Sequence, residues 1–227
     1  MISDSVLRDA LLVAAKDLRL ERRSKIGIAQ VLPFAVLVLL LFAFALDPDR
    51  NILRQATPGL FWVTVLFSAV LTLQRSFGVE AEDGILDALR LSGMSPAGIY
   101  LGKVVALVVQ LLALEVVLAL GVAILYDTRF IGIPLLIGVS VTATLGIAGA
   151  GAVYGALAAR LRSRDTLLPL LLLPLLAPVL ISATRGFEVS LEREAVSGWP
   201  WAALLGIFAL VYVALGSLLF RPLLEDA

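Results

Sequence analysis

Long uncharged stretches alternate with short polar connections along this chain. They cover residues 26–46, 55–74, 104–126, 130–159, 166–184 and 195–220, and among them only 104–126 holds a charged residue, Glu115. Each stretch is long enough to cross a hydrocarbon core of about 30 Å as a helix, which satisfies its own backbone hydrogen bonds. The pattern therefore predicts an all-α integral membrane protein, a single transmembrane domain over 1–227. The six spans are expected at about 26–46, 55–74, 96–126, 130–159, 166–184 and 199–220.

The segment before the first span predicts an amphipathic helix over residues 1–25. Leu7, Leu11, Ala14 and Leu18 recur there at helical spacing, with charged residues largely on the other faces. Ten charges among the first 25 residues argue against a cleaved signal peptide. Such a helix could lie along an anionic membrane surface, and the alternative is a solvated basic tail that only sets the topology.

Composition narrows the range of functions. The 227 residues are 60% hydrophobic and 16% charged, whereas soluble domains average about 45–50% and about 25%. The 18 basic and 18 acidic residues balance, so bulk charge does not suggest a nucleic-acid partner. The chain has neither Cys nor His, which excludes disulfides, thiol or imidazole catalysis, and Cys/His ligation of a metal or haem by this chain. No catalytic residue and no metal ligand is predicted.

Basic residues set the expected orientation. Of the 18 Lys and Arg residues, 13 fall on the side that holds both termini and 5 on the other side. Because cytoplasmic loops carry the excess of positive charge, both termini are predicted to be cytoplasmic. Tryptophans favour membrane interfaces, and Trp62, Trp199 and Trp201 all fall near the outer ends of their predicted spans.

Three features inside the spans are candidates for packing or function. Gly151 and Gly155 form a small-xxx-small pair, which favours close helix contact within the chain or between two copies. Three prolines predict a kinked or locally unwound fifth span, which either moves or packs statically: Pro169, Pro174 and Pro178. Glu115 is near the predicted midplane, where a carboxylate is costly; it either contacts a cavity, proton or substrate or makes a structural hydrogen bond.

The longest polar connection, residues 75–103, predicts a short amphipathic helix over 78–93. Ile85, Leu86 and Leu89 share one face of it, and acidic residues load its first half. Gly93 suits a helix stop, and Ser95 followed by Pro96 suits the start of the third membrane helix. A projecting helix of this kind fits a groove on a soluble partner, and the alternative is an ordinary loop folded on its own protein. The chain has no phosphate-binding G-x-x-x-x-G-K-[ST] motif, so any ATP must be bound by a separate subunit.

Four runs of residues resemble a known family. They are 57–62 (Thr-Pro-Gly-Leu-Phe-Trp), 73–77 (Leu-Gln-Arg-Ser-Phe), 82–89 (Glu-Asp-Gly-Ile-Leu-Asp-Ala-Leu) and 173–181, a Leu-Pro-x-x-x-Pro run. Together with the six spans, they are similar to the haem exporter protein B family of the cytochrome c maturation system, a branch of the type 2 ABC permeases. The resemblance covers most of residues 6–220, and Gln74 departs from the acidic residue of the family pattern.

The resemblance implies a permease subunit, not itself an enzyme, in a bacterial cytoplasmic (inner) membrane. It implies that the helix between spans two and three couples to an ATPase through Glu82, Asp83, Gly84, Ile85, Leu86 and Leu89. The implied partners are an ATPase subunit that binds ATP and Mg, a second copy of the permease, a Trp-rich haem-handling membrane protein and a periplasmic haem chaperone, with haem as the cargo. The alternatives are a type 2 permease for a lipid, drug or polysaccharide, and a membrane scaffold that does not transport.

Overall fold

The computed structural model describes residues 2–24, 26–46, 50–82, 93–158, 164–191 and 197–225. These ranges contain seven helices and no strand, which confirms the predicted all-α fold class. The helices are α1 (Ile2–Ser24), α2 (Ile26–Leu46), α3 (Arg50–Glu82), α5 (Pro96–Leu125), α6 (Ile133–Ala158), α7 (Arg164–Leu191) and α8 (Trp199–Glu225).

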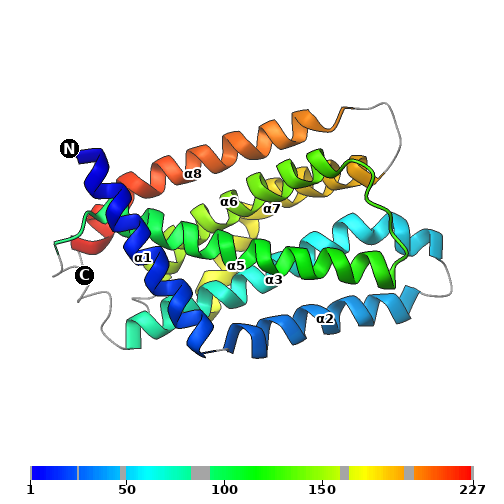
Figure 1. Cartoon of the computed structure of the whole chain (residues 1–227), viewed down its shortest axis with the longest axis horizontal. Helices are drawn as coiled ribbons and strands as arrows, with labels where there is room; N and C mark the ends of the chain where they lie inside the picture. The colour runs from blue at the N-terminus through cyan, green and yellow to red at the C-terminus, as the bar shows by residue number, and fades with distance from the viewer. Residues whose placement is uncertain are drawn as a thin grey trace.

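Six of these helices form a bundle, and the seventh lies across one end of it. Helices α2, α3, α5, α6, α7 and α8 run along the long axis, while α1 crosses the end at which both chain termini lie (Figure 1). In the described ranges, all six helices of the bundle are long and apolar enough to cross a membrane, as the sequence predicts. We refer to the two ends of the bundle as the α1 end and the opposite end.

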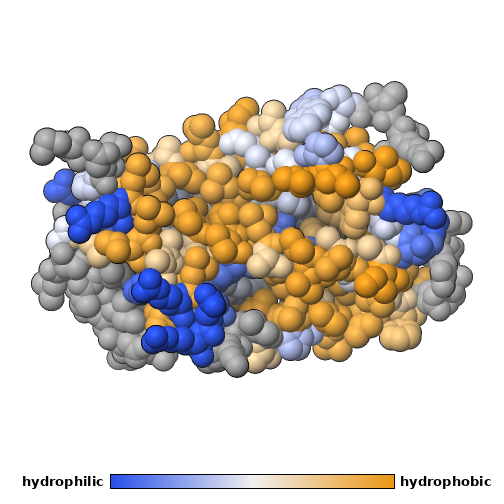
Figure 2. Space-filling view, viewed as in Figure 1, coloured by the Kyte–Doolittle hydropathy of each residue, from blue (hydrophilic) through white to orange (hydrophobic). Residues whose placement is uncertain are grey.

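The surface of the bundle matches a lipid environment. A broad hydrophobic region covers the middle of the molecule, and hydrophilic residues gather at the two ends (Figure 2). Large apolar side chains are exposed on it, including Phe44, Ile124 and Leu218, which are 77%, 78% and 74% exposed. In water such a patch would be a strong aggregation site, whereas in a bilayer these side chains face acyl chains.

Two helices are longer than their predicted spans. Helix α3 begins at Arg50 and continues unbroken to Glu82, so residues 78–82 extend this helix and do not start a separate one. Helix α7 runs on to Leu191, past the predicted end at 184, because its polar last turns are held by other contacts. Arg185 pairs with Glu188 at 2.8 Å, and the backbone N–H of Gly132 donates to the Ser190 carbonyl at 2.9 Å.

The rest of the predicted coupling helix lies outside the described residues. This applies to Asp83, Gly84, Ile85, Leu86 and Leu89, while Glu82 is described only as the last residue of α3.

Helix α7 stays helical through all three of its prolines, Pro169, Pro174 and Pro178, so no local unwinding occurs there. Neighbouring helices α3, α6 and α8 pack against it. The Ser182 hydroxyl donates to the Pro178 carbonyl at 2.8 Å. Packing and side-chain hydroxyls of this kind let a membrane helix tolerate proline without breaking.

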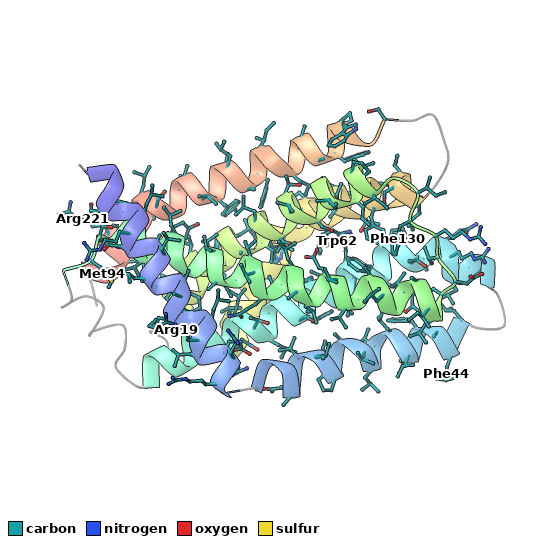
Figure 3. All side chains as sticks on the ribbon, viewed as in Figure 1. Arg19, Phe44, Trp62, Met94, Phe130 and Arg221 are labelled. Carbon is teal, nitrogen blue, oxygen red and sulfur yellow. The ribbon has the colours of Figure 1, made fainter. Side chains whose placement is uncertain are left out.

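The prediction that Trp62 is near a membrane interface is wrong. Helix α3 starts five residues earlier than expected, so Trp62 lies twelve residues, or about 18 Å, inside it. Its side chain is 0% exposed and packs inside the bundle (Figure 3). Trp199, at the start of α8, is 56% exposed and is therefore available to an interface.

Candidate functional site

Helix α1 and the start of α5 are in backbone contact, and two glycines make this possible. A Cβ atom at Gly102 would lie 2.6 Å from the Ala10 carbonyl oxygen and 2.6 Å from the Val13 Cβ. One at Gly98 would lie 2.7 Å from the Asp9 Cβ. Gly98 and Gly102 are thus a small-xxx-small pair that lets α1 pack directly on α5.

The buried face of α1 shares Ala14 with the predicted apolar stripe but leaves Leu7 and Leu11 of that stripe outside the contact. Ala10, Val13 and Ala14 are buried, whereas Leu7 and Leu11 are 59% and 69% exposed. Helix α1 therefore has one apolar face against the protein and a second that is free to contact lipid.

Asp9 of α1 holds the start of α5. Its carboxylate accepts hydrogen bonds from the Ser95 backbone N–H at 2.9 Å and the Ser95 hydroxyl at 3.0 Å. The Ser95 hydroxyl oxygen in turn accepts from the Gly98 N–H at 3.2 Å, which confirms Ser95 as the N-cap. Gly93, just before it, has φ 72, the left-handed conformation that glycine adopts without strain.

Two charged contacts tie α1 to both helices that flank residues 83–92. The side chain of Lys103 on α5 is 1% exposed, and its Nζ lies 3.6 Å from the Asp17 carboxylate and 4.8 Å above the Phe77 ring. Arg75 on α3 pairs with Glu21 at 3.3 Å. A buried ammonium group needs such compensation, because an unpaired one is strongly destabilising.

We call this set of contacts the α1 junction. It comprises Asp9, Asp17 and Glu21 of α1, Arg75 and Phe77 of α3, and Ser95, Gly98, Gly102 and Lys103 of α5.

Gly151 and Gly155 join α6 to α3 within the chain. A Cβ at Gly151 would collide with the Leu73 side chain, and one at Gly155 with the ring of Phe77. The sequence left open whether this pair packs within the chain or between two copies, and the structure shows the contact within the chain. Because Phe77 also lies under Lys103, this contact continues the α1 junction into the bundle.

Tyr100 extends the same connection to α8. Its hydroxyl lies 3.0 Å from the Gly149 carbonyl oxygen of α6 and 3.1 Å from that of Tyr212 in α8. A Cβ at Gly216 of α8 would collide with the Tyr100 ring, so the absence of a side chain at Gly216 leaves room for the ring. The first turns of α5 therefore contact α1, α6 and α8 at one end of the bundle.

Glu115 lies inside the bundle and is bonded to α6. Its side chain is 4% exposed, and the Thr144 hydroxyl donates to its Oε1 atom. The Ser140 hydroxyl, one turn earlier on α6, is a second hydrogen-bond partner of the carboxyl group. We call Glu115, Ser140 and Thr144 the intramembrane polar cluster.

Tyr126 and an ion pair organise the opposite end. The Tyr126 hydroxyl donates to the Leu39 carbonyl of α2 at 3.0 Å, which joins the end of α5 to α2. Arg54 pairs with Asp127 at 2.5 Å on the exposed surface, where such a pair adds little stability.

The contacts described above join helices to one another. In the ranges that the structure describes, no three His, Cys, Asp or Glu side chains gather into a possible metal site. The α1 junction links α1 to α3 and α5, the two helices that flank residues 83–92, and Phe77 connects it to Gly155 of α6.

Sequence reasoning missed the parts of the junction that depend on distant partners. The spacing of Gly98 and Gly102 is visible in the sequence as the same small-xxx-small signal noted for Gly151 and Gly155. By contrast, nothing local marks Lys103 as buried, because its partners Asp17 and Phe77 come from two other helices.

Comparisons with known proteins agree over nearly the whole chain. The family model for CcmB protein matches residues 8–223. The chain is 34% identical over 209 residues to heme exporter protein B of Pseudomonas aeruginosa, covering 88% of this chain and 90% of the relative. It is 31% identical over 214 residues to heme exporter protein B of Paracoccus denitrificans, covering 91% and 92%. For heme exporter protein B of Escherichia coli K12 the identity is 34% over 185 residues, covering 81% and 83%.

Proposed function

The chain belongs to the CcmB protein family, and from that premise we propose that it is the membrane permease subunit of a haem exporter that serves cytochrome c maturation. The relatives that carry the name heme exporter protein B match it along most of their length. Six membrane spans, together with the α1 junction that links helices at one end of the bundle, are features expected of a permease. With no His or Cys in the chain, haem is cargo that this subunit cannot ligate through imidazole or thiolate.

The α1 junction is the observation that best supports a mechanism for transmitting ATP-driven motion to the membrane helices. In this proposal, residues 82–89 dock on a separate ATPase subunit, which binds ATP and Mg. ATP-driven displacement of this segment pulls on α3 and α5 together, because both helices are fixed to α1 by the Arg75–Glu21 and Lys103–Asp17 pairs. The motion then enters α6 through the Phe77–Gly155 contact.

The orientation in the membrane, the route of the haem and the second permease copy are further parts of the same proposal. The α1 end faces the cytoplasm of a bacterial inner membrane, since 13 of the 18 basic residues are on that side. Haem passes to a periplasmic chaperone, or the loaded chaperone is released, with the help of a Trp-rich haem-handling membrane protein. A second copy of the permease completes the membrane part.

Purification from the native membrane in mild detergent, followed by mass spectrometry, tests the assembly. We expect an ABC ATPase and a haem-handling membrane protein to co-purify with the chain. Recovery of an ATPase without any cytochrome maturation subunit would favour a type 2 permease for another cargo. Absence of an ATPase would contradict the transporter proposal and favour a scaffold.

Substitutions in the docking segment test the coupling. Leu86→Glu and Leu89→Glu place a charge on the apolar face of the proposed docking helix, so we expect the partner ATPase activity to lose its dependence on the permease. Asp87→Glu keeps the charge of the same segment and is the matched control. Unchanged ATPase regulation in both Leu variants would contradict the proposed docking.

A further inference from the structure

Several buried side-chain polar atoms have no hydrogen-bond partner among the described residues. Two of them are the indole Nε1 of Trp62 and the Oε2 atom of Glu115, and Ser68 Oγ of α3 is another. The Trp62 side chain is 0% exposed and that of Glu115 is 4% exposed. Buried polar groups left unpaired are costly, and native proteins usually satisfy them with protein groups or ordered water.

The register of α3 against α6 sets Trp62 level with the intramembrane polar cluster. Gly151 faces Leu73 and Gly155 faces Phe77, so facing residues of these two helices differ by 78 in number. The same difference sets Trp62 level with Ser140, and Leu66 level with Thr144.

The helical faces agree with this register. Trp62 and Leu66 precede Leu73 by eleven and seven residues, spacings that keep all three on the α3 face turned toward α6. Ser140 and Thr144 precede Gly151 by the same two spacings on α6. The labelled position of Trp62 in the interior of the bundle is consistent with this placement (Figure 3).

Glu115 reaches the same seam from α5. It is a hydrogen-bond partner of both Ser140 and Thr144, so its carboxyl group lies against the α6 face that α3 covers. The seam between α3, α5 and α6 thus holds an indole N–H without an acceptor and a carboxyl oxygen without a partner.

We propose that this seam binds a water molecule that bridges Trp62 Nε1 and Glu115 Oε2. Water is the ligand with the required chemistry, because it accepts a hydrogen bond from the indole and then donates to a carboxylate or accepts from a carboxylic acid. A buried water needs two to four polar partners, and the indole N–H and the carboxyl oxygen supply two. The bound water joins three membrane helices and does not depend on the nature of the cargo.

A protein with Trp62 as its single tryptophan provides the test. The chain has three tryptophans, and Trp199→Phe with Trp201→Phe leaves only the buried one. In the purified protein, the hydrogen-bonded state of the Trp62 N–H is measured by ultraviolet resonance Raman spectroscopy. We expect a hydrogen-bonded N–H, whereas a free N–H would overturn the proposal.

Variants at position 115 identify the partner. In the same background, Glu115→Gln retains a polar group for the water and should leave the N–H hydrogen-bonded, while Glu115→Leu should free it. Val116→Leu, at a position that is 62% exposed, is the matched control and should change nothing. A hydrogen-bonded N–H that persists in a folded Glu115→Leu protein would contradict the site.

A high-resolution cryo-electron microscopy map of the intact, unmutated complex distinguishes a bridging water from a direct hydrogen bond between Trp62 and Glu115. We expect density for one water between Trp62 Nε1 and Glu115 Oε2. A direct bond between these atoms, or two unpaired atoms without density between them, would overturn the proposal even if haem export is confirmed.

Discussion

At the scale of single residues, Lys103 is the side chain on which the α1 junction depends most. It is 1% exposed, and its charge is compensated by Asp17 and the Phe77 ring. Asp17→Asn would leave a buried charge without its partner, so we expect a loss of about 3 kcal/mol in the free energy of unfolding. Thermal unfolding of the purified protein in detergent measures this loss.

Two further variants separate charge from packing at this site. Adding Lys103→Met to Asp17→Asn should restore most of the stability, because Met keeps an apolar stem against Phe77 without a charge. Lys16→Met removes the other ion pair of Asp17, at 2.7 Å, in which the lysine side chain is 31% exposed, and should cost less than about 1 kcal/mol. Equal losses in the single and double variants would show that the ion pair does not stabilise the junction.

The intramembrane polar cluster gives a second prediction at this scale. Thr144→Val removes the hydroxyl that donates to Glu115 and should cost about 1 kcal/mol, the usual size of a hydrogen bond between membrane helices. Thr142→Val, which removes only bonds to the Gly138 and Val139 carbonyls of the same helix, should cost less.

Glu115→Gln should preserve assembly and cytochrome c production, because the amide oxygen still accepts from Thr144. Loss of cytochrome c in a normally assembled complex would show that the carboxyl group takes part in transport.

At the scale of elements, helix contacts depend on the absence of side chains at particular glycines. Gly102→Ala places a Cβ 2.6 Å from the Ala10 carbonyl oxygen, a backbone atom that cannot move without α1. We expect a loss of about 2 kcal/mol from this overpacking. The same substitution at Gly206, where the nearest atom is 3.8 Å away, should be neutral or gain up to about 1 kcal/mol from helix propensity. Thermal unfolding of both variants checks the difference, and equal stability would show that α1 does not pack as described.

The elements also show how far the sequence alone could lead. Spans and the Ser95 N-cap are local signals, since each depends on residues within one helix, and they were predictable. The burial of Trp62 was not predictable, because it depends on where α3 begins and on the helices that pack around it. The face of α1 that contacts α5 was not predictable either, since Val13 and Leu7 are equally apolar and only the position of α5 decides which is buried.

At the scale of the whole molecule, the orientation in the membrane can be tested without background labelling, because the chain has no cysteine. Ser5 in α1 and Ser197, two residues before α8, are both exposed. Helix α1 crosses one end of the bundle, and α8 begins at the opposite end (Figure 1). In spheroplasts, a membrane-impermeant maleimide should label Ser197→Cys, and it should label Ser5→Cys only after permeabilisation. The reverse pattern would invert the proposed topology.

The most direct test of the proposed mechanism is the amount of haem delivered to the periplasmic chaperone per ATP hydrolysed, measured in the purified complex in liposomes. The Asp17→Asn/Lys103→Met protein should fold and its complex should hydrolyse ATP, but α1 and α5 are no longer held by their ion pair. We expect the ratio to fall about fivefold or more, the lower range of typical coupling between distant sites. An unchanged ratio in a folded complex that hydrolyses ATP would contradict transmission through the α1 junction.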